Sequence, residues 1–345
     1  MQHHSTNRPI ALWLIACAAT VFAMILLGGI TRLTHSGLSM VEWKPLLGAI
    51  PPLNDTDWWV VFDKYRAFPE YQKLNAGMSL AEFKFIFYLE YFHRLLGRMI
   101  GLIFLLPLIY FWIRSRISKS LLPKLLALFV LGGLQGLLGW YMVKSGLIDE
   151  PRVSQYRLTA HLGAAVIIYA YMLWIAFGLL RQNSLPSSSG NRRLYHYSTA
   201  VTLLIFVMIL SGGLVAGTHA GFAYNTFPLM AGKWIPDGLF ALQPLWRNAF
   251  ENIITVQFDH RLLACFVALS VFVLVALVFK WTKTSELRIS ALLLLLLLSL
   301  QISLGTATLL YIVPVTLASL HQAGAILLFT ASLYLTRQLK PVHVN

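Results

Sequence analysis

Long apolar runs separated by short polar segments dominate the hydropathy pattern of this chain. A bilayer core of about 30 Å is crossed by about 20 apolar residues in a helix. Eight runs reach that length, and the seventh contains an unbroken leucine stretch at 292–298. The pattern therefore predicts an all-α integral membrane protein with eight transmembrane helices. The predicted spans are 10–31, 85–113, 121–143, 158–181, 195–216, 254–280, 287–311 and 315–336.

The composition supports this class and excludes two others. The 345 residues are 58% hydrophobic and 12% charged, with a mean hydropathy of +0.69, which excludes a soluble globular protein. The formal charge of +14 does not indicate nucleic-acid binding, because the basic residues lie in short connections between spans. Cys17 and Cys265 lie in separate apolar spans, so we expect neither an extramembrane disulfide nor a cysteine metal site.

Basic residues are unevenly distributed among the connections. The second, fourth and sixth connections and the C-terminal tail carry clusters of lysine and arginine, whereas the seventh carries no charge. Such clusters concentrate on the cytoplasmic side of membrane proteins. We therefore predict that both termini and the even-numbered connections are cytoplasmic. The first outer connection, about 32–84, is rich in Trp, Pro and Tyr, and we expect it to fold against the membrane surface.

The second half of the chain repeats motifs of the first half in the same order. Each half has an even number of spans, so both copies share one orientation and are related by an axis along the membrane normal. We predict two pseudo-symmetric four-helix bundles, 1–183 and 195–345, joined by a Ser-rich cytoplasmic linker at 184–194. The matched segments are LLGGITRLTHSGLS (26–39) with LSGGLVAGTHAGFA (210–223), EYFHRLL (90–96) with QFDHRLL (257–263), LQGLLG (134–139) with LQISLG (300–305), and LTAHLGA (158–164) with ASLHQAG (318–324).

Each even-numbered span carries one histidine at a matching position: His93, His161, His260 and His321. All four fall in the outer part of their predicted helices, so each bundle offers two imidazoles at similar depth. Such histidines could simply be hydrogen-bonded to neighbouring carbonyls or hydroxyls. Four of them, paired and repeated, favour two heme sites with two histidine ligands each. Copper and zinc are alternative metals for these histidines, although two histidines are fewer protein ligands than a zinc site usually has.

The repeat breaks beside the histidines, where Glu90 aligns with Gln257. Glu90 lies three residues before His93 and shares its helix face. A carboxylate beside a heme edge could take a proton or stabilise developing positive charge, and pairing with Arg94 at i,i+4 is the alternative. Arg94 and its counterpart Arg261 either reach lipid headgroups or pair with heme propionates. The break suggests that one half carries out chemistry while the other transfers electrons.

These motifs resemble heme A synthase, in its mitochondrial and proteobacterial branch. The resemblance covers almost the whole chain. It is carried by GGITRLTHSGLSMVEWKP (28–45), FPEYQKLNAGMSLAEFKFIFYLEYFHRLLGRMIGL (68–102), LGGLQGLLGWYMVKSGL (131–147), YRLTAHLGAA (156–165), FDHRLLA (258–264) and LHQAGA (320–325).

The resemblance implies an oxidoreductase that converts a ring methyl of heme O to a formyl group through a hydroxymethyl stage, giving heme A for terminal oxidases. It implies that His93 and His161 are the iron ligands of the substrate heme. It also implies that His260 and His321 are the iron ligands of a heme b cofactor, and that Glu90 is the essential acidic residue. The implied partners are membrane lipid, a heme O synthase and an electron carrier, and small residues on the helix surfaces could support a homo-oligomer.

The sequence departs from the Bacillus-type branch of the resembled family in one respect. That branch carries a cysteine pair in the first outer loop, and this chain has no cysteine there. A disulfide in that loop therefore cannot deliver electrons or hand over heme. Nine residues precede the first predicted span, so we expect no transit peptide. We accordingly expect a bacterial plasma (inner) membrane location, with the heme sites toward the outer face.

Three other functions use some of the same features. An electron-transfer cytochrome b would have two equivalent heme sites, and the difference between Glu90 and Gln257 counts against it. A transporter would have broken helices and polar residues near the midplane, whereas these histidines lie toward one end of continuous apolar runs. A heme chaperone would share every ligand with the enzyme and would differ only in making no product.

Overall fold

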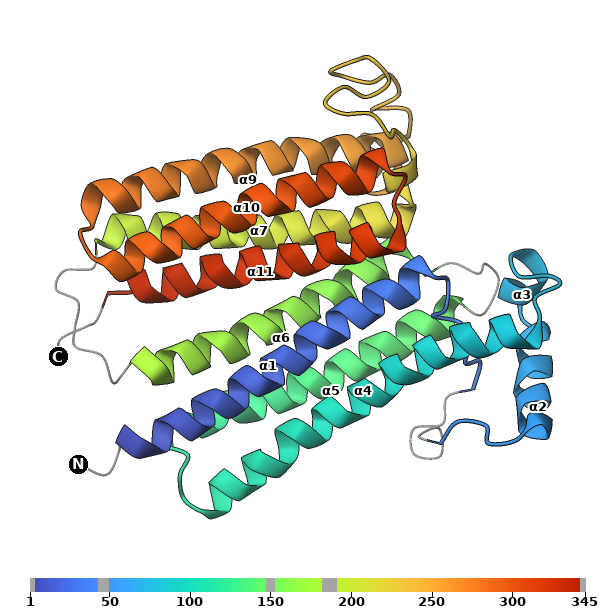
Figure 1. Ribbon diagram of the computed structural model, residues 1–345, viewed down its shortest axis with the longest axis horizontal. Helices are drawn as coiled ribbons and strands as arrows, with labels where there is room; N and C mark the ends of the chain where they lie inside the picture. Colours follow the sequence, from blue (N-terminus) through green and yellow to red (C-terminus); the bar gives the residue numbers. More distant parts are fainter. Residues whose placement is uncertain (1–3, 43–49, 147–152, 182–190, 342–345) are drawn as a thin grey trace. The chain divides into compact units, whose positions relative to one another are not determined.

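The computed structural model describes residues 4–42, 50–146, 153–181 and 191–341 (Figure 1). Within these residues it contains eight helices that are long and apolar enough to cross a membrane. Each coincides with a predicted span, so the all-α membrane class and the eight spans are confirmed. The helices are α1 (His4–Leu33), α4 (Leu80–Ile113), α5 (Leu122–Gly146), α6 (Gln155–Arg181), α7 (Arg192–Thr218), α9 (Ile253–Trp281), α10 (Ser285–Leu310) and α11 (Val315–Leu339).

The chain divides into two compact units. One unit holds Ala19–His161, and the other holds Met1–Ala18 together with Leu162–Asn345. We call them the 19–161 unit and the 162–345 unit. Residues 184–190 of the predicted Ser-rich linker lie outside the described residues, and its last three, 192–194, already belong to α7, whose N-cap is Asn191. The predicted bundle boundaries, the pseudo-symmetry and the cytoplasmic placement of the termini stay predictions.

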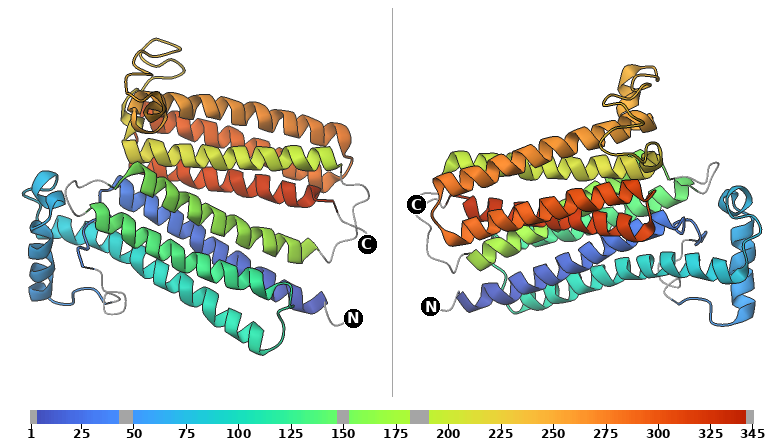
Figure 2. Two further views of the ribbon diagram at one scale, coloured as in Figure 1. Left: turned by 180° about the vertical axis from the view of Figure 1, so that it is seen from behind. Right: turned by 45° about the horizontal axis from the view of Figure 1, so that its top comes forward.

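In the 19–161 unit, the connection before α4 is folded over the described residues 50–79, and its position against the membrane surface stays a prediction. It contains α2 (Asp55–Arg66), which is capped by the Asn54 side chain, and the short α3 (Pro69–Lys73). Both lie at the start of α4 in each view (Figures 1 and 2). We call residues 54–78 the α2–α3 cap. Its apolar side chains Trp58, Phe62 and Tyr65 are buried against Phe83 and Phe87 of α4.

In the 162–345 unit, α7, α9, α10 and α11 pack side by side (Figures 1 and 2). A seam of buried hydroxyl groups joins α7 to α11, in which Ser198 contacts Thr336 at 2.6 Å and Thr202 contacts Ser332 at 2.7 Å. Hydroxyl pairs of this kind hold membrane helices together where water is excluded. Shorter elements connect the long helices: η2 (Ala220–Phe222), η3 (Leu245–Arg247) and α8 (Asn248–Glu251).

Candidate functional site

The four histidines lie as two pairs, one in each unit. His93 on α4 and His161 on α6 belong to the 19–161 unit. His260 on α9 and His321 on α11 belong to the 162–345 unit. The structure thus places both members of each predicted pair in the same unit.

Two of the imidazoles press against glycines on a neighbouring helix. A β-carbon added to Gly139 of α5 would lie 2.9 Å from Cε1 of His161, and one added to Gly305 of α10 would lie 2.7 Å from Cε1 of His321. Both distances are shorter than side chains tolerate, so only glycine leaves room for the ring. Gly28 and Gly212 similarly face His93 and His260, at 3.2 and 3.5 Å.

A glutamine lies one helical turn before each of these two close glycines. Gln135 Nε2 donates a hydrogen bond to the His161 carbonyl at 2.8 Å, and Gln301 Nε2 donates to the His321 carbonyl at 3.0 Å. The glutamine fixes the backbone at the histidine, and the glycine four residues later gives the imidazole its space. This Gln–Gly pair was not among the predicted site residues, although both members are visible in the aligned segments LQGLLG and LQISLG.

The glycines directly beside the histidines have a different role. A β-carbon on Gly163 would meet the Leu210 side chain at 2.8 Å, and one on Gly324 would collide with the Gln301 side chain. Both positions therefore serve close packing of helices. The space around the imidazoles comes from the facing helix instead.

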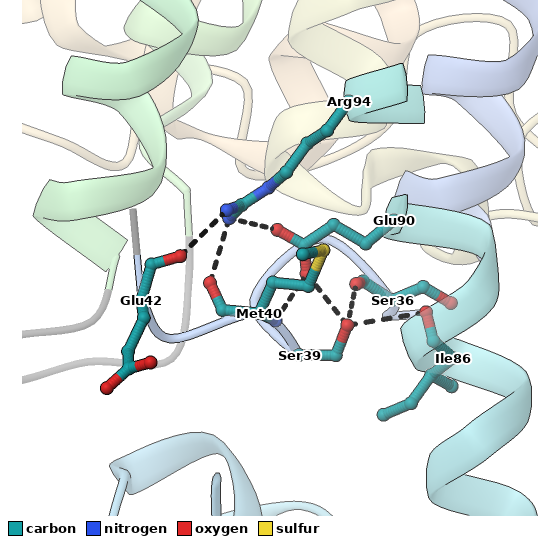
Figure 3. A network of polar contacts seen from close by, with 7 residues as sticks. All are labelled: Ser36, Ser39, Met40, Glu42, Ile86, Glu90 and Arg94. Carbon is teal, nitrogen blue, oxygen red and sulfur yellow. Dashed lines mark hydrogen bonds and ion pairs between the residues drawn. The ribbon is translucent and has the colours of Figure 1, made fainter. Parts of the chain in front are cut away.

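Glu90 is the centre of a buried network in the 19–161 unit (Figure 3). Its Oε2 accepts hydrogen bonds from Ser39 Oγ and from the Met40 backbone N–H, both at 2.7 Å. Its Oε1 pairs with Arg94 Nη2 at 2.5 Å. Arg94 also donates to the carbonyls of Met40 at 2.8 Å and Glu42 at 3.2 Å. The i,i+4 pair is therefore present, and both side chains hold the 36–42 loop.

The matching residues of the 162–345 unit make a different set of bonds. Gln257 Nε2 and Arg261 Nη2 both donate to the Tyr224 carbonyl, at 3.1 and 3.0 Å. Arg261 Nε and Nη1 are buried and have no hydrogen-bond partner among the described residues. A buried guanidinium is costly without an acceptor, and carboxylate and phosphate oxygens are the acceptors that match it best.

One histidine has a hydroxyl partner that its counterpart cannot have. Ser211 Oγ lies 3.0 Å from His260 Nδ1. The residue aligned with Ser211 in the first half is Leu27, which carries no polar group. When a histidine binds a metal through Nε2, a bond at Nδ1 fixes the tautomer and the ring orientation. Sequence comparison of the two halves shows this difference, but only the structure places the hydroxyl at the ring.

A second buried carboxyl group lies in the α2–α3 cap. Glu70 is 4% exposed and accepts a hydrogen bond from the Tyr65 hydroxyl at 3.2 Å, and that hydroxyl accepts one from Asn75 at 2.7 Å. The pKa of Glu70 is raised to about 8, chiefly by burial; the hydrogen bond from Tyr65 opposes this rise and the nearby charge of Glu90 adds to it. Hydropathy gave no indication of this residue, because it lies in a polar connection.

The donor sets suit a heme better than a bare metal ion. Among the described residues, no group of three or more His, Cys, Asp or Glu side chains is placed to hold a metal. Structural zinc needs four protein ligands and catalytic zinc three. A heme needs only two axial histidines, because its ring supplies the other four iron ligands.

The fold and the site define the class: a helical membrane protein with eight apolar helices and a pair of histidines in each of two units. Comparison with known sequences supplies the family. Residues 11–333 match COX15-CtaA, the cytochrome oxidase assembly proteins, and the chain belongs to this family.

Individual relatives align along nearly the full chain. The heme A synthase of Nitrosospira multiformis is 54% identical, with 98% of this chain and 96% of that protein aligned. The heme A synthase of Parvibaculum lavamentivorans is 47% identical, with 96% and 93% aligned. Heme A synthase COX15 of Homo sapiens is 43% identical, with 98% and 84% aligned.

Proposed function

We propose that the protein is a heme A synthase, an oxidoreductase that converts a ring methyl of heme O to a formyl group through a hydroxymethyl intermediate. The observation that carries this proposal is the alignment of almost the whole chain with heme A synthases such as that of Nitrosospira multiformis, at 54% identity. The two histidine pairs give each half of the chain a site that suits a heme.

The proposed ligands are His93 and His161 for the substrate heme O, and His260 and His321 for a heme b cofactor. When bound, heme b supplies one-electron transfer. The glycines that face the imidazoles support these assignments, because they leave each ring room to reach a ligand. The unpartnered nitrogens of Arg261 suit a propionate of heme b.

Glu90 is the proposed catalytic residue. Converting a methyl to a formyl group removes four electrons in two steps and adds one oxygen atom, from water or O2. With water, four electrons pass to the electron carrier and four protons are released, and positive charge develops at the reacting carbon as the electrons leave. A carboxylate held rigidly near the substrate stabilises such charge. Three hydrogen bonds from Ser39, Met40 and Arg94 hold the Glu90 carboxylate in one position. Arg94 serves this network, so its proposed propionate contact has less support than that of Arg261.

The deciding experiment is acid extraction and mass analysis of the hemes bound to the purified protein after expression with a heme O synthase. We expect heme B together with heme O, its hydroxymethyl form or heme A. Heme B alone in both sites would indicate an electron-transfer cytochrome. Heme O without any oxidised product, in the presence of a working electron acceptor, would indicate a heme carrier.

A further inference from the structure

Three cations lie close together in the 162–345 unit, and two of them contact one tryptophan. The Arg337 guanidinium lies 4.8 Å from the centre of the Trp174 ring, and Lys340 Nζ lies 5.7 Å from it. Arg181 Nη1 donates to the Arg337 carbonyl at 2.5 Å and to the Lys340 carbonyl at 3.2 Å. We call Arg181, Arg337 and Lys340 the basic cluster. It joins the C-terminal ends of α6 and α11.

The two helices that carry this cluster contain no acidic residue. The chain contains no Asp or Glu between residues 151 and 236, nor between residues 287 and 345, and these stretches include α6 and α11. Neither Arg181 nor Arg337 is paired with a carboxylate among the described residues. Arg337 Nε is buried and lacks a hydrogen-bond partner there. Positive charge is thus concentrated where a buried donor still lacks an acceptor.

Two simpler explanations do not account for all the contacts of the basic cluster. Arg181 caps carbonyls at the end of α11, but capping leaves Arg337 and Lys340 unexplained. Basic residues that only set topology would extend into water, whereas Arg337 lies directly over Gly178 of α6, where any side chain would collide with it. The proposed heme ligand His321 lies sixteen residues earlier on α11, about 24 Å away at the helical rise, so the cluster is no part of that site.

We propose that the basic cluster binds the phosphate headgroup of an anionic phospholipid. Guanidinium groups match phosphate oxygens, and basic pockets between helix ends are a typical recognition site for lipid headgroups. Trp174 suits the boundary between headgroups and acyl chains. Along the helices from the cluster, Phe177 of α6 packs edge-on against the exposed Tyr334 of α11, with ring centres 5.0 Å apart. This aromatic surface gives an acyl chain a place to lie, which a soluble anion would not need.

The test uses the full-length protein in detergent, titrated with phosphatidylglycerol and observed by native mass spectrometry. We expect the Arg337→Gln/Lys340→Gln variant to bind this lipid at least about tenfold more weakly than the parent protein. The matched control is Lys280→Gln/Lys283→Gln, which removes two exposed charges near the end of α9. We expect its affinity to stay near that of the parent.

Equal losses in both variants, or none in the cluster variant, would overturn the proposal. So would equally tight binding of phosphatidylcholine, whose headgroup has no net charge. Inorganic phosphate should not compete at concentrations equal to the lipid; if it does, the cluster binds a soluble anion. Lys340→Gln alone guards against misfolding, because it leaves the Arg337 packing intact, and we expect about a fivefold loss from it.

Discussion

The two histidine-bearing units differ in their electrostatics at matching positions. One carries Glu90 and Arg94, and the other carries Gln257 and Arg261. In the 19–161 unit, Glu90 accepts the Met40 N–H and neutralises Arg94. In the 162–345 unit, Gln257 donates to the Tyr224 carbonyl, and two buried nitrogens of Arg261 find no partner in the part of the chain that the structure describes. The same framework thus holds a neutralised arginine in one unit and a cation with free donors in the other.

This difference fits the proposed division between a substrate and a cofactor. A cofactor that stays bound benefits from a guanidinium that holds its propionate. A substrate that must leave as product benefits from a pocket in which the arginine is already paired. The comparison teaches that a single exchange of carboxylate for amide can change the charge of a site while leaving its framework unchanged.

The largest expected effect comes from making the first unit resemble the second. Glu90→Gln removes the carboxylate and lets the amide donate to the Met40 carbonyl, as Gln257 does to Tyr224. We expect heme A formation to fall by about 100-fold or more, as for loss of a group that stabilises charge in the transition state, while heme binding persists. Heme extraction with mass analysis measures both. Gln257→Glu is the control. Heme A formation at the normal rate in Glu90→Gln would contradict the proposed catalytic role of Glu90.

The next largest effect should come from filling the space that a glycine leaves beside one histidine in each unit. Gly305→Ala places a methyl group 2.7 Å from the His321 ring, and Gly139→Ala places one 2.9 Å from the His161 ring. Overpacking of this kind costs about 1–3 kcal/mol, so we expect heme affinity to fall by on the order of tenfold in the altered unit. Heme content per chain measures it. Gly136→Ala is the matched control on α5, because a β-carbon there meets nothing within 4 Å.

A moderate effect should come from the hydroxyl that only one unit has. With Nε2 on iron, His260 Nδ1–H donates to Ser211 Oγ, which makes the imidazole a stronger ligand. We expect Ser211→Ala to weaken heme binding in that unit by about tenfold and to raise the heme reduction potential. Redox titration of the purified protein measures this. Leu27→Ser is the reciprocal change, and an equal shift from both variants would contradict the proposed orientation by Ser211.

The smallest effect concerns the α2–α3 cap; in the described residues of the 162–345 unit, only the short η2, η3 and α8 lie between α7 and α9. Glu70 has a folded-state pKa of about 8, which burial raises above the ordinary glutamate value of 4.5. Its protonated form is therefore favoured by folding, and cap stability should fall as pH rises from the unfolded pKa through about 8. Hydrogen exchange of α2, corrected for intrinsic rates, should show more opening at pH 8 than at pH 6.

Glu70→Gln should remove that pH dependence, because the amide stays neutral. The exposed Asp63, also on α2, supplies the control Asp63→Asn, which should leave the dependence in place. A dependence that survives Glu70→Gln would mean that another group in the cap titrates.

Sequence patterns predicted the parts of this molecule that depend on local regularity. Hydropathy gave the eight spans, and the internal repeat gave His93, His161, His260 and His321. The Gln135–Gly139 and Gln301–Gly305 pairs were present in the aligned motifs, but their role depends on which helix each side chain faces. Hydropathy does not show which neighbouring helix a side chain faces.

Contacts between distant segments could not be predicted in this way. Met40 and Glu90 lie 50 residues apart, and Arg181 and Arg337 lie 156 apart. Each contact depends on how helices pack after they form. The i,i+4 pairing of Glu90 with Arg94 could be anticipated because it is local, whereas its connection to the 36–42 loop could not.

The way in which Glu90 and Arg94 hold Met40 has a consequence for mutational tolerance. They contact its main-chain N–H and carbonyl, so these bonds do not depend on the side chain at position 40. Substitutions to other amino acids that keep this backbone should be neutral for the network, and tyrosine stands at the aligned position 224. Proline is the exception, because it lacks the N–H. A sequence library would therefore show wide variation at a residue that lies at the centre of the network.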